Sequence, residues 1–213
     1  MTLHSPVIPP KARLHPWAAA QLTAQERYEQ MLIEGMRFDG QDARLLHFEQ
    51  TLCRDTGFRG VESEGIQLVD CRLVDCDLAN ARWSNGGLHR VTFQKCRMTG
   101  FIGTESLFEE VLFHDCMLDL ALFRYAVLRH VRFKDCLLQE ADLQGAKLTD
   151  VRFEGCSLAQ VQLSQSRLRD VNIAGCAIDG LRIGMSEVAG LTVDPAQALA
   201  LVQLFGVKIE WPA

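Results

Sequence analysis

The chain has 213 residues, of which 48% are hydrophobic, and its formal net charge is −5. This amount of apolar sequence is enough for one continuous core. No stretch approaches the roughly 18 apolar residues of a transmembrane helix, which excludes a membrane-spanning protein.

Residues 1–23 carry several prolines, among them Pro9, Pro10 and Pro16, and they lack the apolar segment of a secretory signal. We expect this segment to be a flexible or loosely docked tail. The absence of a signal and of a membrane span predicts a cytoplasmic protein with no membrane partner.

The next segment has the marks of a short helix. Thr23 followed by Glu26 is typical of a capping box, in which two side chains satisfy the free amides at the start of a helix. The sequence therefore predicts an N-terminal capping helix over residues 24–35, with Tyr28 turned towards the core and Gly35 at its end.

Residues 36–193 follow one pattern, in which an apolar residue returns at every fifth position from Phe38 to Val193. Ala43, Cys53, Ser63 and Gly103 are the series positions without a large apolar side chain. A spacing of five fits neither the period of an α-helix nor that of a β-strand. A fixed short repeat of this kind predicts a solenoid.

Small or β-branched residues stand two positions before the large ones, and like residues recur at every twentieth position. The clearest such column contains Cys76, Cys96, Cys116, Cys136, Cys156 and Cys176. Twenty residues are four units, so we expect four sides to each coil and like residues stacked on like. Two side chains in five then point inward and three point outward.

Two positions depart from this pattern. Gly103 is small where a large residue is expected, and Phe101 is large where a small one is expected, so we expect the two to exchange volumes in a close-packed core. Ser63 has no such partner, and residues 57–65 could form a distorted corner or a small loop.

The run from Gln139 to Leu148 resembles the pentapeptide-repeat family, whose units read A-(D/N)-L-x-x. The likeness covers residues 36–193. It implies an all-β solenoid, namely a right-handed quadrilateral parallel β-helix, here of about eight coils.

The last segment, residues 194–213, is predicted to close the rod. Asp194 is an N-cap candidate, Pro195 suits the first helical position, and Gly206 suits the position after the last turn. We therefore expect a helix over residues 196–205. The alternating residues that follow predict a short strand.

This ending is more apolar than a cap requires, since one face can close the rod while another needs a partner. The candidate dimer interface comprises Leu199, Val202, Leu204, Phe205, Val207, Ile209 and Trp211. The ending resembles that of quinolone-resistance pentapeptide proteins, which implies a homodimer of two rods joined end to end about a two-fold axis. The alternative is that the whole segment folds back on its own coil.

The outward positions show no catalytic constellation. The histidines are scattered, and the sequence contains neither a glycine-rich phosphate loop nor a metal-ligand pair. The cysteines are predicted to be small apolar fillers, because nothing marks the chain as secreted and a single column cannot form a tetrahedron. We expect no enzymatic activity, and no catalytic, cofactor-binding or metal-binding residues.

The quinolone-resistance relatives bind DNA gyrase, and the explanation for that family is mimicry of duplex DNA by an acidic rod. The resemblance therefore implies a non-enzymatic protein that modulates or protects this topoisomerase. Charge supports this in part, because residues 24–80 hold 12 acidic and 6 basic residues whereas residues 81–213 hold 15 and 14. The candidate acidic surface comprises Glu49, Asp55, Glu62, Glu64, Asp70, Asp75 and Asp77.

Further along the chain, Lys147, Arg167 and Arg169 interrupt any acidic stripe, which weighs against mimicry over the whole rod. No continuous basic stripe is present either, so we expect no direct contact with nucleic acid.

A group of apolar residues at outward positions forms a second candidate surface for a protein partner. Its members are Ile102, Met117, Leu120, Leu122, Tyr125 and Leu137. We expect them to fall on two adjoining faces, where a contiguous apolar patch usually marks an interface. The amino-terminal tail could instead cover them. If they are uncovered, the alternative function is a protein-interaction scaffold unrelated to topoisomerases.

Overall fold

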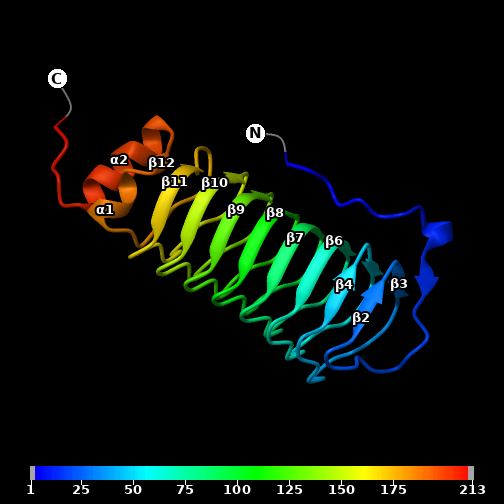
Figure 1. Ribbon diagram of the computed structural model, residues 1–213. Coiled ribbons are helices and arrows are strands. Elements are labelled where there is room, and N and C mark those ends of the chain that lie inside the picture. Colours follow the sequence, from blue (N-terminus) through cyan, green and yellow to red (C-terminus); the bar gives the residue numbers. More distant parts are fainter. Residues whose placement is uncertain (1–2, 211–213) are drawn as a thin grey trace.

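In the computed structural model, which describes residues 3–210, the backbone pairs with itself at an offset of twenty residues (Figure 1). Val91 lies opposite Val111, and Phe113 lies opposite Phe133, with all paired strands parallel. The chain thereby forms a parallel β-helix of about nine turns, which confirms the predicted solenoid.

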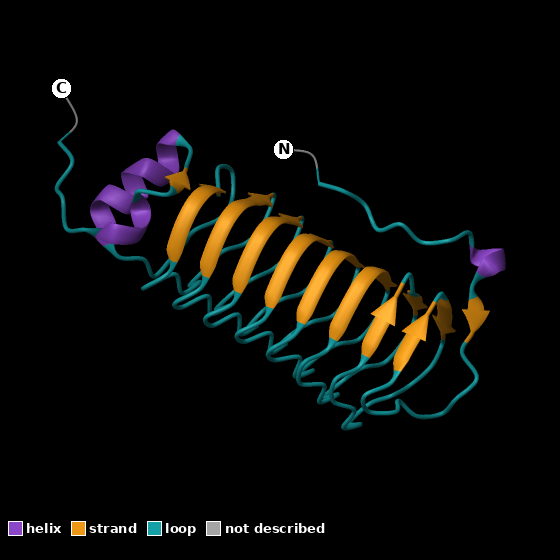
Figure 2. Cartoon of the chain, viewed as in Figure 1, coloured by secondary structure: helices purple, strands orange, loops and turns teal. Residues whose placement is uncertain are grey.

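The strands and helices follow one another along this rod (Figure 2). In chain order they are the 3₁₀ helix η1 (Lys11–Arg13), β1 (His15–Pro16), β2 (Arg27–Glu29), β3 (Met31–Glu34), β4 (His47–Glu49), β5 (Leu52–Arg54), β6 (Gln67–Val74), β7 (Gly87–Gln94), β8 (Leu107–His114), β9 (Val127–Lys134), β10 (Lys147–Glu154), β11 (Arg167–Asn172), α1 (Met185–Val188), β12 (Leu191–Thr192) and α2 (Pro195–Leu204).

Each coil has four sides, which we number by the large residue that points inward. In one coil, Leu118 marks side 1, Phe123 side 2, Leu128 side 3 and Phe133 side 4, and all four are fully buried. The long strands β6 to β10 cover sides 3 and 4, whereas sides 1 and 2 pair through isolated bridges such as Met117 with Leu137.

The corners between sides require a left-handed backbone at every fifth residue. Asp115, Asp135 and Gly145 have φ values of 54°, 53° and 70°. L-residues other than asparagine and aspartate adopt this conformation at a cost, and glycine adopts it freely. A turn at each fifth residue therefore explains why the repeat is five residues long.

The core is a set of ladders that run along the rod axis. The rings of Phe93, Phe113, Phe133 and Phe153 stack with centroid separations of 5.0, 4.8 and 4.8 Å. All eight cysteines are buried and unpaired, and the Sγ atom of Cys136 donates to the carbonyl oxygens of Phe113 and Lys134. The cysteines are therefore inward-facing fillers, as predicted.

The expected exchange of volume between Phe101 and Gly103 is confirmed. Phe101 is fully buried, and a Cβ atom on Gly103 would lie 3.0 Å from its ring and 2.8 Å from that of Phe108. Residues 57–65 form part of a regular solenoid turn and not a loop, since Gly57 and Glu62 pair with the neighbouring turns. The hydroxyl of Ser63 is satisfied inside the core because it donates to the carbonyl oxygen of Ala43 at 2.6 Å.

The prediction of a helix over residues 24–35 is wrong. This segment forms β2 and β3, which pair with β4 and β5 and add a coil to the rod. Gln25 and Gln30 take the left-handed corner conformation, so the five-residue repeat overrides the local helix signal. Tyr28 and Ile33 keep the register of Phe38, and this was the signal that could have revealed the extra coil.

The tail is docked more closely than expected. β1 pairs with β3, and the ring of Trp17 lies edge-on against Tyr28 at 4.6 Å and against Phe38 at 5.5 Å. Leu22 is also buried against the core. These residues cover the first coil, while the segment before η1 folds back along the rod (Figure 1).

The predicted C-terminal helix is confirmed as α2. Asp194 and Gln197 form a reciprocal capping box, and the Gln197 amide also donates to the carbonyl oxygens of Ile173 and Cys176 at 2.8 Å. The sequence did not predict α1, which interrupts the last coil. Neither helix is long and apolar enough to cross a membrane, nor is any other in residues 3–210.

The predicted strand after α2 is wrong over residues 207–210, which have no strand conformation, and Trp211 lies outside the described residues. Alternating apolar residues form a strand only where a neighbouring strand satisfies their backbone groups. In residues 3–210, no strand pairs with this segment.

The exchange of volume generates a test by a double-mutant cycle. Phe101→Ala should lower the free energy of unfolding by about 3–5 kcal/mol because it leaves a cavity, and Gly103→Leu should lower it by about 1–3 kcal/mol because it overpacks the core. The double variant restores the ordinary order of small and large residues, so it should be more stable than Phe101→Ala alone. Chemical denaturation of all four proteins measures this coupling, and strictly additive losses would contradict it.

Candidate protein-binding surfaces

The six apolar residues predicted as a partner surface lie together on sides 1 and 2. Met117 and Leu137 are paired neighbours on side 1, and Ile102 and Leu122 are paired neighbours on side 2. Leu120 lies at the corner between these sides, and Tyr125 lies at the following corner. We call this surface the apolar belt: Ile102, Met117, Leu120, Leu122, Tyr125 and Leu137.

The apolar belt is open to solvent. The exposed fractions of Met117, Leu120, Tyr125 and Leu137 are 45%, 51%, 57% and 47%, while Ile102 and Leu122 are half-buried. The ring of Tyr125 extends over the next coil, where a Cβ atom on Gly145 would lie 2.5 Å from it. Large side chains therefore form a continuous surface over adjacent coils.

Charged residues limit the belt along the rod. On side 1 it is preceded by Arg97, which pairs with Asp77 at 3.5 Å. On side 2 it is followed by Asp142, which pairs with Arg124 at 2.6 Å. An apolar centre with a polar rim is the usual composition of a protein–protein interface.

Two belt residues also occupy strained backbone positions. Leu120 and Tyr125 have φ values of 59° and 57°. Among the corners of the described chain, Leu45 is the one other position where a large apolar or tyrosine side chain adopts the left-handed region. Because the fold requires the left-handed conformation at every corner, these two positions are distinguished by their large apolar or aromatic side chains and not by the conformation itself.

The tail leaves the belt uncovered. Its described residues before η1 run along the corner between sides 3 and 4, where the backbone N–H of Val7 donates to Asp70 at 2.9 Å and His4 pairs with Glu110. The apolar belt lies on other sides of the rod. The sequence could not distinguish these two outcomes, because the contacts of the tail depend on distant residues.

The seven acidic residues predicted as a surface do not form one. Asp77 lies on side 1 and Glu62 on side 2. The other five lie at three different corners: Glu64 between sides 2 and 3, Glu49 and Asp70 between sides 3 and 4, and Asp55 and Asp75 between sides 4 and 1. Four of them form ion pairs, in the pairs Glu49–Arg27, Asp55–Arg37, Asp70–Arg90 and Asp77–Arg97.

The strongest of these pairs is between Asp70 and Arg90. Two guanidinium nitrogens donate to the two carboxylate oxygens, each at 2.7 Å, and the side chain of Asp70 is 7% exposed. The hydrogen bonds from Arg90 hold the pKa of Asp70 below its usual value. Asp70 therefore stabilises the fold at neutral pH, and this contribution is lost as the pH falls through its lowered pKa.

The predicted dimer residues lie on and after α2 and differ in exposure. Leu199, Val202, Leu204 and Val207 are exposed, while Phe205 and Ile209 are half-buried. Leu201, which lies across α2 from Leu199, is buried against the core. One face of the helix therefore closes the rod, as expected.

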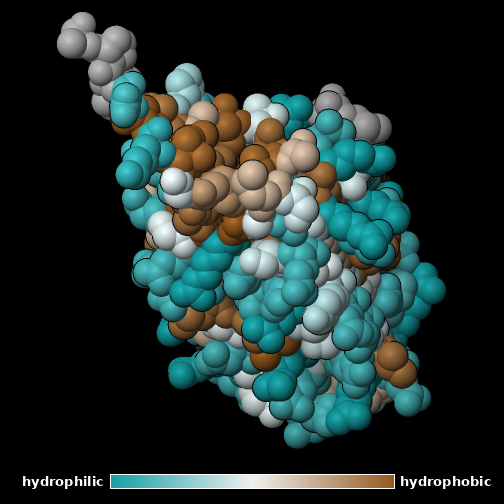
Figure 3. Space-filling model, turned by 90° about the vertical axis from the view of Figure 1, so that its left-hand side faces the viewer, coloured by the Kyte–Doolittle hydropathy of each residue, from teal (hydrophilic) through white to brown (hydrophobic). Residues whose placement is uncertain are grey.

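The other face of α2 contributes to an apolar end surface. Figure 3, which views this end of the molecule, shows hydrophobic atoms gathered over part of it. Met185 of α1 is 72% exposed and adds to the apolar surface of this end. A hollow of about 160 Å³ lies between α2 and the last coil, with Leu204 in its wall.

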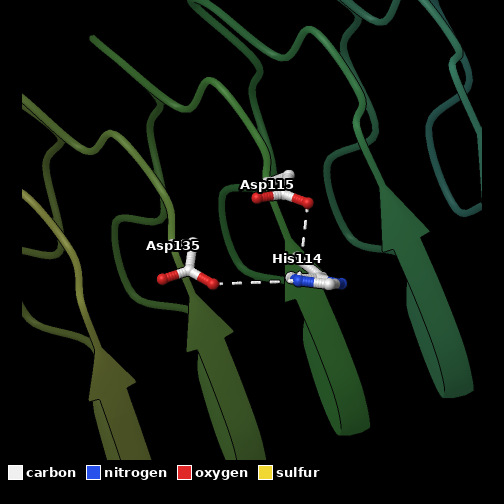
Figure 4. A group of neighbouring side chains, drawn as sticks. All are labelled: His114, Asp115 and Asp135. Carbon is white, nitrogen blue, oxygen red and sulfur yellow. Dashed lines mark ion pairs between the residues drawn. The ribbon is translucent and has the colours of Figure 1, made fainter.

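One cluster of titratable side chains has the composition of a metal site. The donor atoms of His114, Asp115 and Asp135 lie within 4.8 Å of one another, at the corner between sides 4 and 1 (Figure 4). His114 Nε2 is 3.4 Å from Asp115 and 3.8 Å from Asp135. These contacts account for the cluster as exposed ion pairs between stacked coils, and we assign no ligand to it.

The thiol of Cys71 is poorly placed for catalysis. Burial raises the pKa of Cys71 to about 12, and its Sγ atom donates to the carbonyl oxygens of Phe48 and Val69. A thiol that is buried, protonated and held by the backbone is inert as a nucleophile.

The chain resembles known proteins in sequence pattern and in fold. A family model described as a pentapeptide repeat region matches residues 66–143 and 106–183. Among curated proteins, none matches the chain in sequence.

Two solved structures are similar to this chain, and the first of them shares its fold. A trypsin-treated form of QnrB1, a plasmid-mediated fluoroquinolone resistance protein, is 16% identical, with a TM-score of 0.56 over 92% of this chain and 97% of that one. HetL, a pentapeptide repeat protein involved in heterocyst differentiation regulation in the cyanobacterium Nostoc sp., is 16% identical, with a TM-score of 0.41 over 81% and 90%.

Proposed function

The chain belongs to the pentapeptide repeat family, and on this premise we propose that it is a non-enzymatic protein that binds a protein partner through the apolar belt. The observation that carries this proposal is the exposure of Met117, Leu120, Tyr125 and Leu137 on two adjoining sides of the rod. Their burial by a partner would remove a large apolar area from water, which is the main driving force of association.

The backbone supports the same conclusion. Leucine and tyrosine at left-handed corners reduce the stability of the fold by about 1 kcal/mol each relative to residues that suit this conformation. Glycine, asparagine and aspartate occupy other corners, for example Asn80, Asn85 and Gly145. Leu120 and Tyr125 therefore lower the stability of the fold, and they offer an advantage only if a partner buries their side chains.

A second candidate function is the modulation or protection of DNA gyrase. It is supported by the likeness of fold to QnrB1 over nearly the whole length of both chains, and by the family resemblance of the C-terminal segment. Mimicry of DNA would be partial at most, because the acidic candidates are spread around the rod and four of the seven are paired with arginine.

We also propose that two copies associate through the end of the rod formed by α1 and α2. The exposed face of α2 carries Leu199 and Val202, which point away from the core that Leu201 closes. A two-fold axis at this end would bury the same apolar surface of both copies. The unpaired state of all eight cysteines is in keeping with a cytoplasmic location, which we propose as well.

The role of the apolar belt can be tested with the variant Leu120→Asn, Tyr125→Asn. Asparagine tolerates the left-handed conformation, so the variant should unfold at the same temperature as the wild type or a higher one. It should lose the binding partners that the immobilised wild-type chain retains from a cell lysate, as identified by mass spectrometry. Leu45→Asn is the matched control, because Leu45 has the same backbone conformation and exposure but lies far from the belt. Equal capture by all three proteins would show that the belt is not the binding surface.

The gyrase hypothesis predicts that the purified protein changes the rate of DNA supercoiling by gyrase at micromolar concentration. The variant Glu62→Gln, Asp75→Asn, Asp77→Asn should require a several-fold higher concentration for the same effect, because it lowers the negative charge near the amino end. A control with the same change of charge is Glu105→Gln, Asp119→Asn, Glu140→Gln. If the wild-type protein leaves supercoiling unchanged, gyrase is not its partner.

The association of two copies predicts a dimer for the full chain in static light scattering. Leu199→Asp with Val202→Asp should halve the measured mass without unfolding the protein, because burial of unpaired carboxylates in the interface is costly. Leu45→Asp, which introduces the same kind of charge at the opposite end of the rod, should remain a dimer. A wild-type chain with the mass of a single copy would contradict this association.

A further inference from the structure

A groove of about 420 Å³ crosses strands β9, β10 and β11 on side 3, near the C-terminal end of the rod. Its polar lining includes Arg129, Lys147, Arg167 and Arg169, which we call the basic groove residues, together with the hydroxyl-bearing Thr149. Leu148 and Leu168 also line it. No acidic side chain of residues 3–210 contributes to the lining.

The twenty-residue register places these positive charges next to one another. Lys147 lies directly opposite Arg167, and Thr149 lies between Arg129 on one side and Arg169 on the other. On its other neighbouring strand, Arg129 lies opposite Glu109, which is 3.4 Å from His89. Within the described chain, none of the four basic groove residues forms an ion pair. Like charges directly opposite each other on paired strands destabilise a sheet.

On side 3 and at its corner with side 4, the coils that precede the groove place opposite charges next to each other. Arg90 pairs with Asp70 at 2.7 Å, and His89 lies 3.4 Å from Glu109. His130, which also lines the groove, pairs with Asp150 at 2.9 Å. Neighbouring coils thus pair opposite charges here, and the positions of Lys147 and Arg167 depart from this pattern.

The groove offers hydrogen-bond donors in excess of acceptors. Three guanidinium groups and one ammonium group donate and cannot accept, and the hydroxyl of Thr149 can donate between two of the arginines. A ligand that satisfies them must carry several anionic oxygens. Guanidinium groups bind phosphate through paired, charge-assisted hydrogen bonds, and four positive charges match more than one phosphate group.

We infer that the basic groove binds a ligand with clustered phosphate groups. Arg129 and Arg169 are two coils apart, which corresponds to about 9.6 Å at the spacing of paired strands, so each can bind a different phosphate of one ligand. The volume of about 420 Å³ lies within the range of about 300–1,000 Å³ that small-molecule sites occupy. The exposed part of Leu168 adds an apolar contact.

The groove is accessible from solvent. The tail follows the corner between sides 3 and 4 as far as Glu110, which His4 contacts. None of the described tail residues lines the groove. This site lies on side 3 and is separate from the apolar belt on sides 1 and 2, so it does not depend on the proposed function.

Isothermal titration of the full chain with inorganic tripolyphosphate and with a short DNA duplex tests the inference. These two probes carry the same chemistry from two sources, a free oligophosphate and a phosphodiester backbone. At low salt at least one of them should bind, and Arg129→Gln with Arg169→Gln should weaken that binding at least about tenfold, because two charge-assisted contacts are lost. Neither arginine forms an ion pair with a described residue, so the unfolding temperature should change little.

Arg59→Gln with Arg182→Gln is the matched control, because both arginines are exposed and form no ion pair with a described residue, and neither lines the groove. This variant has the same net charge and should bind as the wild type does. Binding of neither probe, equal loss in both variants, or citrate binding as tight as that of tripolyphosphate would each overturn the assignment. The tighter of the two probes identifies the source of the phosphate groups.

Discussion

The backbone hydrogen bonds between residues twenty positions apart are the constraint on which the rest of this structure depends. They form only if each coil closes after four sides, and closure requires a left-handed residue at every fifth position, as at Asp115, Leu120 and Tyr125. Once this register is set, the inward or outward direction of every side chain in the rod follows. The core, the corners and the surface are therefore consequences of one repeated backbone geometry.

Stacking of equivalent positions makes each column behave as a unit. In the core, the parallel rings of Phe93, Phe113 and Phe133 show how identical residues pack when the coils superimpose. On the surface, the same geometry brings charges on adjacent coils close together, and Asp70 and Arg90 show the favourable arrangement. Departures from this arrangement are informative, since the fold alone does not require them.

Two such departures lie on different sides of the rod. The apolar belt places leucine and tyrosine at corners that suit glycine or asparagine. The basic groove gathers four positively charged side chains in a lining that contains no carboxylate of the described residues. Each of these two surfaces lowers the stability of the fold relative to a surface with ordinary polar residues at the same positions. A straight solenoid can hold two such sites independently, because each coil contacts only its neighbours and the sides face in different directions.

The sequence by itself determined the solenoid, its twenty-residue period, the inward position of the cysteines, the exchange between Phe101 and Gly103, and the helix that Asp194 caps. All of these follow from periodicity or from caps that involve residues close in sequence. The sequence also predicted that the six residues of the apolar belt lie close together, since their relative positions depend on the register alone.

Tertiary structure decided what local signals could not. The segment after Thr23 has a helix signal, but hydrogen bonds to the next coil make it β2 and β3. The path of the tail, and hence the exposure of the belt, depends on contacts of Val7 and His4 with distant carboxylates. The scatter of the acidic residues and the clustering of Arg129 with Arg169 depend on which corner each residue occupies, because charge counted along the chain carries no information about the side of the rod on which it lies.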